Sequence, residues 1–209
     1  MYKLPSKTRI DKKYKLSDIL KQINASKEAR KESHLINSII LSNLLSPKTL
    51  NCIDNVELFI FEIGLKERII PLQFLKEFDS KFKNNIIFYL KHEDYKLMLF
   101  EYKHNKFKGK YYMTNWNNDE DKELPLLQNV SEIYKFILSE FLDYSPLENE
   151  SIIEYLTRND KLFKYDLKMK KLKQAIATEV QSKNKFELNA KYKLLLKEKE
   201  DLLRGKENE

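Results

Sequence analysis

The middle of the chain carries a short and almost unbroken apolar run. In VELFIFEIGL, residues 56–65, large apolar side chains occupy both alternating sets of positions, which is typical of a central strand covered on both faces. Pro71 then suits the first turn of a helix, PLQFLKEFDSKF. IIFYLK and YKLMLFEYK predict two strands joined by a tight turn at 92–94, and GKYYMTNW predicts a further strand. The pattern predicts the order β-α-β-β-β.

The N-terminal segments show other patterns. Residues 1–15 are interpreted as an extended basic arm, and Ser17 is the predicted cap of a short helix, LSDILKQIN. A longer helix is expected from about Ser26 because apolar residues recur there at spacings of three and four. It should end at Ser46-Pro47, since the residue before proline avoids helical geometry. Its apolar face would consist of Leu35, Ile36, Ile39, Ile40, Leu44 and Leu45.

Helical spacing returns toward the C-terminus. VSEIYKFILSEFLDY, residues 130–144, predicts one helix, and residues 147–204 contain neither glycine nor proline. Two antiparallel helices are expected at 158–182 and 186–204, turning at SKNK. Their predicted contact joins Leu172, Ile176 and Val180 to Leu188, Tyr192 and Leu195. A single continuous helix is the alternative, and its exposed apolar stripe would form a homodimeric coiled coil.

These elements predict an α/β (α+β) fold, with a small mixed sheet, flanking helices and a C-terminal helical hairpin or coiled coil. We expect residues 1–146 to form the α/β core domain with its basic arm, and residues 147–209 to form the helical appendage. Apolar side chains that a hairpin leaves uncovered favour a protein partner. The predicted partner-binding residues are Leu188, Tyr192, Leu195 and Leu202.

Composition narrows the class of protein. The 209 residues are 42% hydrophobic and 34% charged, with only three glycines, which favours a folded, helix-rich chain. The single cysteine, Cys52, excludes an internal disulfide and a cysteine zinc cluster, and we expect it to be buried. No apolar segment resembles a secretory signal or is long enough to span a bilayer. A cytoplasmic protein without membrane contact is expected.

Motifs for catalysis are missing from the sequence. It contains no GxxxxGK[ST], GxGxxG, GxSxG or HExxH motif, so we predict no catalytic residues, metal site or cofactor. A magnesium-dependent nuclease would need an acidic residue followed by Glu-x-Lys on adjoining strand ends. Glu62 and Lys66 are instead four residues apart, and Asp79 and Glu101 are the other carboxylates near predicted elements. A divergent nuclease is therefore the alternative function.

The net charge of +7 suits a polyanionic partner. The predicted nucleic-acid-binding residues lie in the basic arm and around Gly109, and they are Lys7, Arg9, Lys12, Lys13, Lys106, Lys108 and Lys110. A third basic run, residues 158–173, would lie on a helix. If the segment after Gly109 is a regular strand, Tyr112, Thr114 and Trp116 share one face and Tyr111 lies on the other. We expect these rings to be core residues and the lysines to be exposed.

Several blocks along the chain together resemble one known family. They are LPSKTRIDKKYKLSDIL, LSPKTLN, VELFIFEIGLKER, YYMTNW, LPLLQNVSEIY and KFELNAKYKLLLKEKEDL. The series, which runs nearly end to end, resembles the bacterial family catalogued as domain of unknown function 4391. The resemblance implies a companion of helicases and DNA methyltransferases in restriction or anti-phage gene clusters. It carries over no catalytic residue. The expectation is a non-catalytic adaptor that docks a helicase or methyltransferase and binds DNA weakly.

Overall fold

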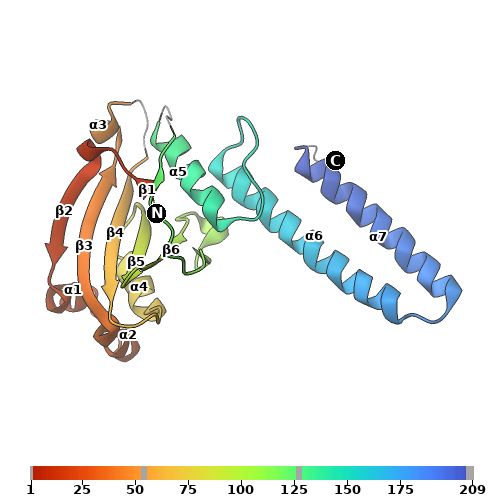
Figure 1. The fold of residues 1–209 in the computed structure, drawn as a ribbon, viewed down its shortest axis with the longest axis horizontal. Coiled ribbons are helices and arrows are strands. Elements are labelled where there is room, and N and C mark those ends of the chain that lie inside the picture. Colours follow the sequence, from red (N-terminus) through yellow and green to blue (C-terminus); the bar gives the residue numbers. More distant parts are fainter. Residues whose placement is uncertain (1, 53–55, 126–128, 206–209) are drawn as a thin grey trace. The chain divides into compact units, whose positions relative to one another are not determined.

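The computed structural model describes residues 2–52, 56–125 and 129–205 (Figure 1). The chain divides into two compact units, Met1–Phe141 and Leu142–Glu209. The first unit is built on a mixed sheet and the second consists mainly of two long helices. This arrangement confirms the predicted fold class.

The sheet of the first unit has six strands in the order β2-β3-β4-β5-β6-β7. Their bounds are β2 Arg9–Tyr14, β3 Ile36–Leu45, β4 Leu58–Leu65, β5 Asn85–His92, β6 Tyr95–Glu101 and β7 Tyr111–Met113. β4 and β5 are parallel, and every other neighbouring pair is antiparallel. A separate two-stranded sheet pairs β1 (Tyr2–Lys3) with β8 (Lys122–Glu123). The predicted β-α-β-β-β order is confirmed by β4, α4 (Leu72–Asp79), β5, β6 and β7.

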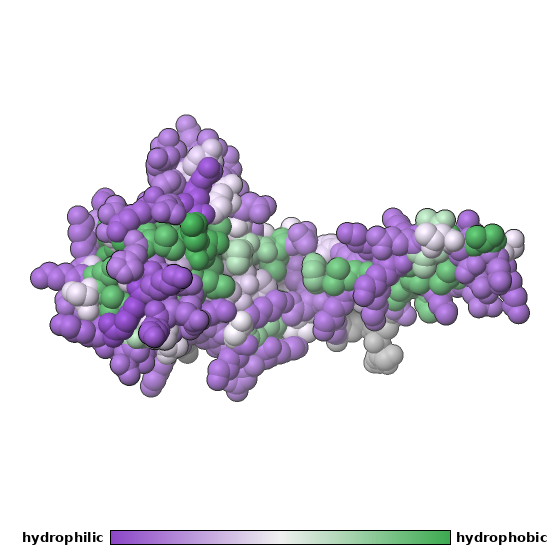
Figure 2. All heavy atoms as spheres, turned by 90° about the horizontal axis from the view of Figure 1, so that it is seen from below, coloured by the Kyte–Doolittle hydropathy of each residue, from purple (hydrophilic) through white to green (hydrophobic). Residues whose placement is uncertain are grey.

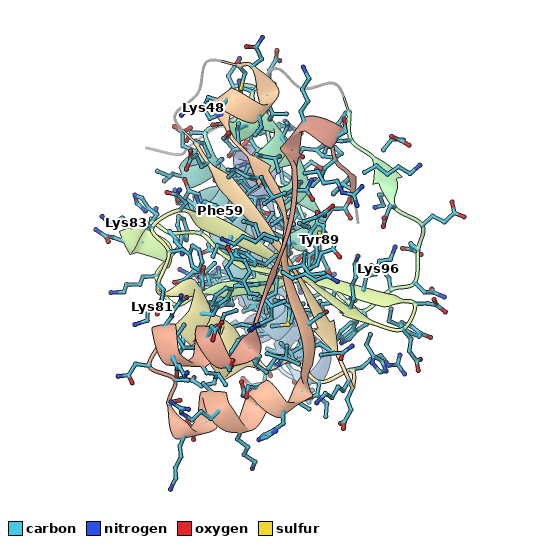
Figure 3. All side chains as sticks on the ribbon, turned by 90° about the vertical axis from the view of Figure 1, so that its left-hand side faces the viewer. Lys48, Phe59, Lys81, Lys83, Tyr89 and Lys96 are labelled. Atoms are coloured by element: carbon cyan, nitrogen blue, oxygen red, sulfur yellow. The ribbon has the colours of Figure 1, made fainter. Side chains whose placement is uncertain are left out.

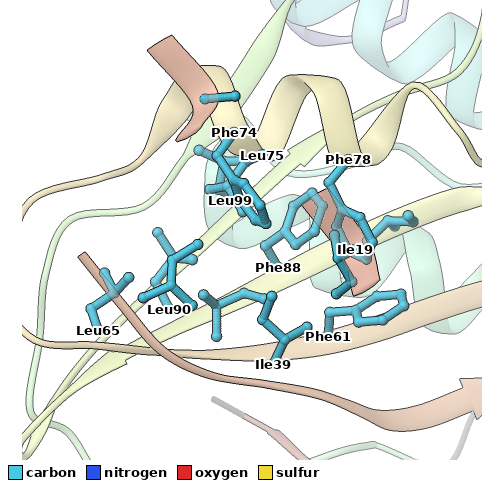
Figure 4. Packing of buried hydrophobic residues seen from close by; sticks show 14 of the residues in the cluster. Ile19, Ile39, Phe61, Leu65, Phe74, Leu75, Phe78, Phe88, Leu90 and Leu99 are labelled. Carbon is cyan, nitrogen blue, oxygen red and sulfur yellow. The ribbon is translucent and has the colours of Figure 1, made fainter. Parts of the chain in front are cut away.

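One face of the sheet is covered by α1 (Leu16–Gln22), α2 (Lys27–Glu32) and α4. Figure 4 shows the phenylalanines of α4 and of the strands packed together in this core. Phe61 of β4 lies at its centre, with its ring centroid 5.1 Å from that of Phe78 and 6.3 Å from that of Phe88. Burying such rings provides most of the driving force for folding.

Two carboxylates fix the ends of these helices to one another. Glu32 of α2 accepts a hydrogen bond of 2.9 Å from the backbone N–H of Phe74 in the first turn of α4. Glu77 of α4 accepts one of 2.9 Å from the N–H of Ser26, the cap of α2. Negative charge at a helix N-terminus is stabilising. These bonds therefore help to hold α4 over the sheet.

The opposite face is covered in part by α5 (Val130–Leu138), which Figure 1 shows on the other side of the sheet from α4. Its buried Tyr134 lies edge-on to Phe100 of β6, with centroids 6.2 Å apart. Phe141, in the short 3-10 helix η4 (Ser139–Phe141), also contacts Phe100, at 4.7 Å. The predicted helix at 130–144 thus ends earlier, in a 3-10 turn.

The long helix expected from Ser26 is wrong. Only α2 and the 3-10 helix η2 (Ser33–Leu35) are helical there, and Ile36–Leu45 forms β3. Register shifts interrupt β3 between Ile36 and Ser38 and again between Leu41 and Asn43. A β-bulge adds one residue to the alternation of two, so Ile36 and Ile39 both reach the same core. That spacing of three imitates a helix.

The ends of that segment follow the prediction more closely. β3 stops at Leu45, and Pro47 begins the short helix α3 (Pro47–Leu50), capped by Ser46.

Ser17 is not a cap, since α1 begins at Leu16 with Lys15 as its N-cap. Cys52, expected to be buried, is half-buried.

The ring placement predicted after Gly109 is also partly wrong. β7 ends at Met113, so the alternation does not continue to Trp116. Tyr112 is buried and stacks on Phe100, with centroids 5.0 Å apart. Trp116 is only partly buried and packs against the α4-side core, as Tyr111 does. Tyr112 and Trp116 therefore lie on opposite faces of the sheet.

The second unit is the predicted helical hairpin rather than a continuous helix. α6 (Ile152–Thr178) and α7 (Ser182–Leu203) pack together. Ser151 and Glu154 form a capping box at the start of α6. Val180, predicted to pack between the helices, lies in their connection and is 91% exposed. None of the helices in the described ranges combines the length and apolar character that crossing a membrane requires.

Candidate functional site

A buried ion pair joins α4 to the end of β6. The Nζ of Lys103 lies 2.9 Å from a carboxylate oxygen of Asp79, and it also donates hydrogen bonds of 2.7 Å to the carbonyls of Asp79 and Phe82. Asp79 is 1% exposed. A cation beside the last carbonyls of a helix is stabilising. The contact with the Oδ1 atom of Asp79 is an ion pair, because that oxygen has no hydrogen-bond partner among the described residues.

Tyr111 and Glu101 complete this cluster. The Tyr111 hydroxyl donates to the other Asp79 oxygen at 3.1 Å, and Glu101 accepts a hydrogen bond from the N–H of Gly109. Burial raises the pKa of Asp79 to about 6, although the contact with Lys103 lowers it. Burial, followed by the charges of Asp79 and Glu101, raises the pKa of the Tyr111 hydroxyl. A carboxyl with a pKa near neutrality is a candidate for chemistry.

The cluster contains the pattern sought for a nuclease, at a place where it was not predicted. Glu101 and Lys103 have the Glu-x-Lys spacing at the end of β6, beside Asp79. The Glu-x-Lys spacing was visible in the sequence. The position of Asp79 beside this pair, at the end of α4, was not. Both Asp79 oxygens already face protein donors. Within the described ranges, no group of three or more histidine, cysteine, aspartate or glutamate side chains is arranged to hold a metal ion.

The strand end that was predicted for this role is arranged differently. Glu62 forms an ion pair of 2.7 Å with Lys91 on the neighbouring strand β5. Lys66 follows β4, and its N–H donates to the carbonyl of Leu35 at 2.8 Å. Glu62 lies within β4 and therefore pairs across the sheet with the neighbouring strand.

The predicted nucleic-acid-binding residues lie at opposite edges of the sheet. Lys7, Arg9, Lys12 and Lys13 precede or belong to β2, whereas Lys106, Lys108 and Lys110 precede β7. All seven are exposed. Strands lie about 4.8 Å apart, so five intervals separate the two edges by about 24 Å. The structure does not join the two sets into one patch.

The set on β2 has a second physical role. An edge strand presents unpaired backbone groups, and charged side chains with a bulge protect it from pairing with other chains. β2 has both features, since its register shifts between Arg9 and Lys12 and Asp11 has a positive φ of 52°. Arg9 pairs with Asp11. The segment expected to be a basic arm is thus an extended part of the sheet.

The β7 edge gathers lysines that the sequence did not indicate. Contacts of Lys103 with the 79–82 backbone bring the end of α4 beside the 101–111 segment. Lys81 and Lys83 are exposed there, on the opposite side of the sheet from Lys96 (Figure 3). We name Lys81, Lys83, Lys106, Lys108 and Lys110 the β7-edge lysines. This edge is the stronger candidate for contact with phosphates.

The hairpin carries several apolar side chains that are more than half exposed. Phe163 of α6, Phe186 and Leu194 of α7 and Val180 of the connection are 54%, 75%, 59% and 91% exposed. Figure 2 shows apolar surface interrupting the polar surface along the hairpin. The predicted partner-binding residues are more covered, because Leu188, Tyr192 and Leu195 are half-buried and Leu202 is buried. Their role in binding stays a prediction.

A groove lies between the two helices. It has a volume of about 460 Å³ and is lined by Lys168, Lys171, Leu172, Lys191, Leu194 and Leu195.

Not every basic residue of the 158–173 run lies on the surface. Arg158 is 5% exposed and donates to both oxygens of Glu150, at 2.7 and 2.9 Å. That arginine anchors the segment before α6.

The fold defines an α/β protein that carries a basic helical hairpin. The chain belongs to the family described as Domain of unknown function (DUF4391), whose model matches residues 3–198. The family resemblance carried by the sequence blocks is thereby confirmed. No curated protein and no solved structure matches the chain.

Proposed function

We propose that this protein is a non-catalytic accessory subunit of a bacterial DNA-directed defence system and acts in the cytoplasm. Its helical hairpin docks a helicase or a DNA methyltransferase, and its lysines provide weak, sequence-independent contact with DNA. The choice of partner follows from what the family resemblance implies. The choice of surface follows from the hairpin.

The observation that carries the proposal is the uncovered apolar surface of the hairpin. Phe186 and Leu194 project from α7 with most of their surface exposed, and only Leu202 of the described α7 side chains is buried. Exposed apolar patches on folded proteins are characteristic of interaction sites. A partner covering this surface would gain about 25 cal/mol per Å² of apolar area removed from water.

Affinity purification from the native host tests this proposal. The tagged full-length protein should recover the helicase or methyltransferase encoded beside it. The double variant Phe186→Asp/Leu194→Asp should lose that subunit. Ile69→Asp is the matched control, because Ile69 is an exposed apolar residue of the first unit, at 52%. Recovery of the same subunit by all three proteins would exclude the hairpin as the docking element.

One observation favours a divergent magnesium-dependent nuclease as a second candidate. Asp79 lies beside a Glu-x-Lys pair, Glu101 and Lys103, and such groups hold magnesium and orient water in nucleases. The adaptor proposal expects purified protein to leave single- and double-stranded DNA intact with magnesium or manganese. Cleavage that disappears in Glu101→Gln, with folding preserved, would favour the nuclease instead.

A further inference from the structure

The groove between α6 and α7 combines an apolar floor with a basic rim. Leu172, Leu194 and Leu195 form the floor, and Lys168, Lys171 and Lys191 form the rim. Leu194 is 59% exposed and the three lysines are exposed. Lysine stems add methylene groups to such a floor while their ammonium groups remain in water. The groove thus offers a place for large apolar side chains beside positive charge.

The shape of this surface favours a helix. Two antiparallel helices form a long shallow furrow between them, and a third helix packs into such a furrow with its apolar stripe facing inward. The groove is lined by one turn from each helix, residues 168–172 and 191–195. One or two large apolar anchors of an amphipathic segment would fill it.

The rim selects the charge of that segment. Among the residues that the structure describes, no carboxylate pairs with Lys168, Lys171 or Lys191. The surrounding hairpin is basic, since residues 152–203 contain 13 lysines and arginines against 8 aspartates and glutamates. Electrostatic complementarity increases the association rate and excludes like-charged partners.

We propose that this groove binds an acidic amphipathic helix of a partner protein, with leucine-type anchors on the floor and carboxylates against the lysines. The inference rests on the proposed function, to which it adds the chemistry of the docked segment. A second copy of the hairpin would bring like charges together. Nucleic acid would satisfy the lysines but leave the leucine floor unexplained.

Fluorescence anisotropy with a labelled heptad peptide tests the inference on the full-length protein. The peptide has leucine at positions a and d and glutamate at e and g, which also prevents it from pairing with itself. A second peptide with lysine at e and g is the charge control. We expect binding of the glutamate peptide and none of the lysine peptide.

Two matched triple variants separate the groove from general charge. Lys168→Glu/Lys171→Glu/Lys191→Glu reverses the rim. Lys170→Glu/Lys183→Glu/Lys193→Glu changes the net charge equally, and its three lysines are exposed and do not line the groove. Lys193 is two residues, or about 200°, from Lys191 around its helix, and Lys170 is about 200° from Lys168 and about 100° from Lys171. The rim variant should bind at least about tenfold more weakly and the control less than about threefold more weakly.

Leu194→Asp tests the floor, because the exposed position tolerates the change without loss of the helical circular-dichroism signal. It should abolish peptide binding. Equal weakening by the two triple variants, or undiminished binding by Leu194→Asp, would overturn the inference. A duplex oligonucleotide that displaces the peptide and binds Leu194→Asp normally would assign the groove to nucleic acid. If the peptide fails to bind but the tagged protein still recovers its helicase or methyltransferase, this inference fails and the adaptor function stands.

Discussion

The Nζ atom of Lys103 lies 2.9 Å from a carboxylate oxygen of Asp79 and 2.7 Å from the carbonyl of the same residue. One side chain at the end of β6 therefore neutralises a buried charge and caps the last turn of α4. The contact joins two elements that are separated by β5 in the sequence. Its loss should affect the whole first unit.

Replacing Lys103 with methionine should be strongly destabilising. The change leaves the buried Asp79 carboxylate without its partner, and breaking a buried pair in this way costs about 3–5 kcal/mol. Urea denaturation of the full-length protein measures the loss. Lys108→Met is the control, because Lys108 is exposed and should change the free energy of unfolding by less than about 0.5 kcal/mol. A loss below about 1 kcal/mol for Lys103→Met would show that the ion pair with Asp79 does not hold α4 to the end of β6.

The stability of the first unit should depend on the protonation of Asp79. Burial raises the pKa of this carboxyl to about 6 from an ordinary value of 3.8. Between these values the folded chain keeps a proton that the unfolded chain has lost. The stabilisation is therefore fully present below about pH 4 and is lost as the pH rises through 6. Its size is about 3 kcal/mol, at 1.36 kcal/mol per pH unit.

The measurement compares the wild type with Asp79→Asn, which cannot ionise. The free energy of unfolding of the wild type should fall relative to that of Asp79→Asn as the pH rises from 4 to 6. Above pH 6 the difference between the two should remain level. The difference is needed because hydrogen bonds and lysine charges lower the pKa of Glu140 and Asp121, and those groups lose stabilisation as the pH falls. A difference that does not vary with pH would show that folding leaves the pKa of Asp79 unchanged.

Two buried tyrosines should respond oppositely to loss of the hydroxyl. Tyr134 and Tyr155 are both fully buried, but the Tyr134 hydroxyl has no hydrogen-bond partner among the described residues. Tyr155 donates to the carbonyl of Tyr144 at 2.8 Å. Tyr134→Phe should stabilise by about 1 kcal/mol, and Tyr155→Phe should destabilise by about 1 kcal/mol. Thermal unfolding followed by circular dichroism would detect the opposite signs, and stabilisation by both changes would refute the argument.

The sheet elements could be predicted wherever their apolar pattern was regular. VELFIFEIGL is apolar on both faces and became a central strand, and the hairpin followed from a repeat that continues on both sides of SKNK. The pattern misled at β3, because two bulges convert alternation into helix-like spacing. β-branched Ile36, Ile39 and Ile40 already favoured a strand. Bulges depend on strand pairing, which a single segment does not reveal.

Contacts between different helices and strands could not be predicted from the sequence. Glu101 and Lys103 have a recognisable spacing, but Asp79 joins them only because α4, which connects β4 to β5, ends beside the residues that follow β6. Similarly, Leu194 was not selected, because the apolar repeat of α7 does not distinguish the side turned to α6 from the side left open. Exposure in the folded hairpin makes that distinction.

The last prediction concerns DNA and distinguishes the two edges of the sheet. Each lysine that neutralises a phosphate contributes about 0.9 to the slope of log affinity against log salt concentration. Lys106→Gln/Lys108→Gln/Lys110→Gln should lower the slope for a short duplex by about 2 to 3 and weaken binding at low salt. Lys12→Gln/Lys13→Gln should leave the slope nearly unchanged, because these residues belong to the opposite edge, where the charges protect β2 from pairing. The β7 edge is favoured because Lys81 and Lys83 lie on the segment held beside it by Lys103. Titration at several salt concentrations, with circular dichroism to verify folding, measures both slopes. A slope that falls only in the β2 variant would move the DNA contact to the N-terminal strand, and unchanged slopes in both variants would remove DNA from the proposed function.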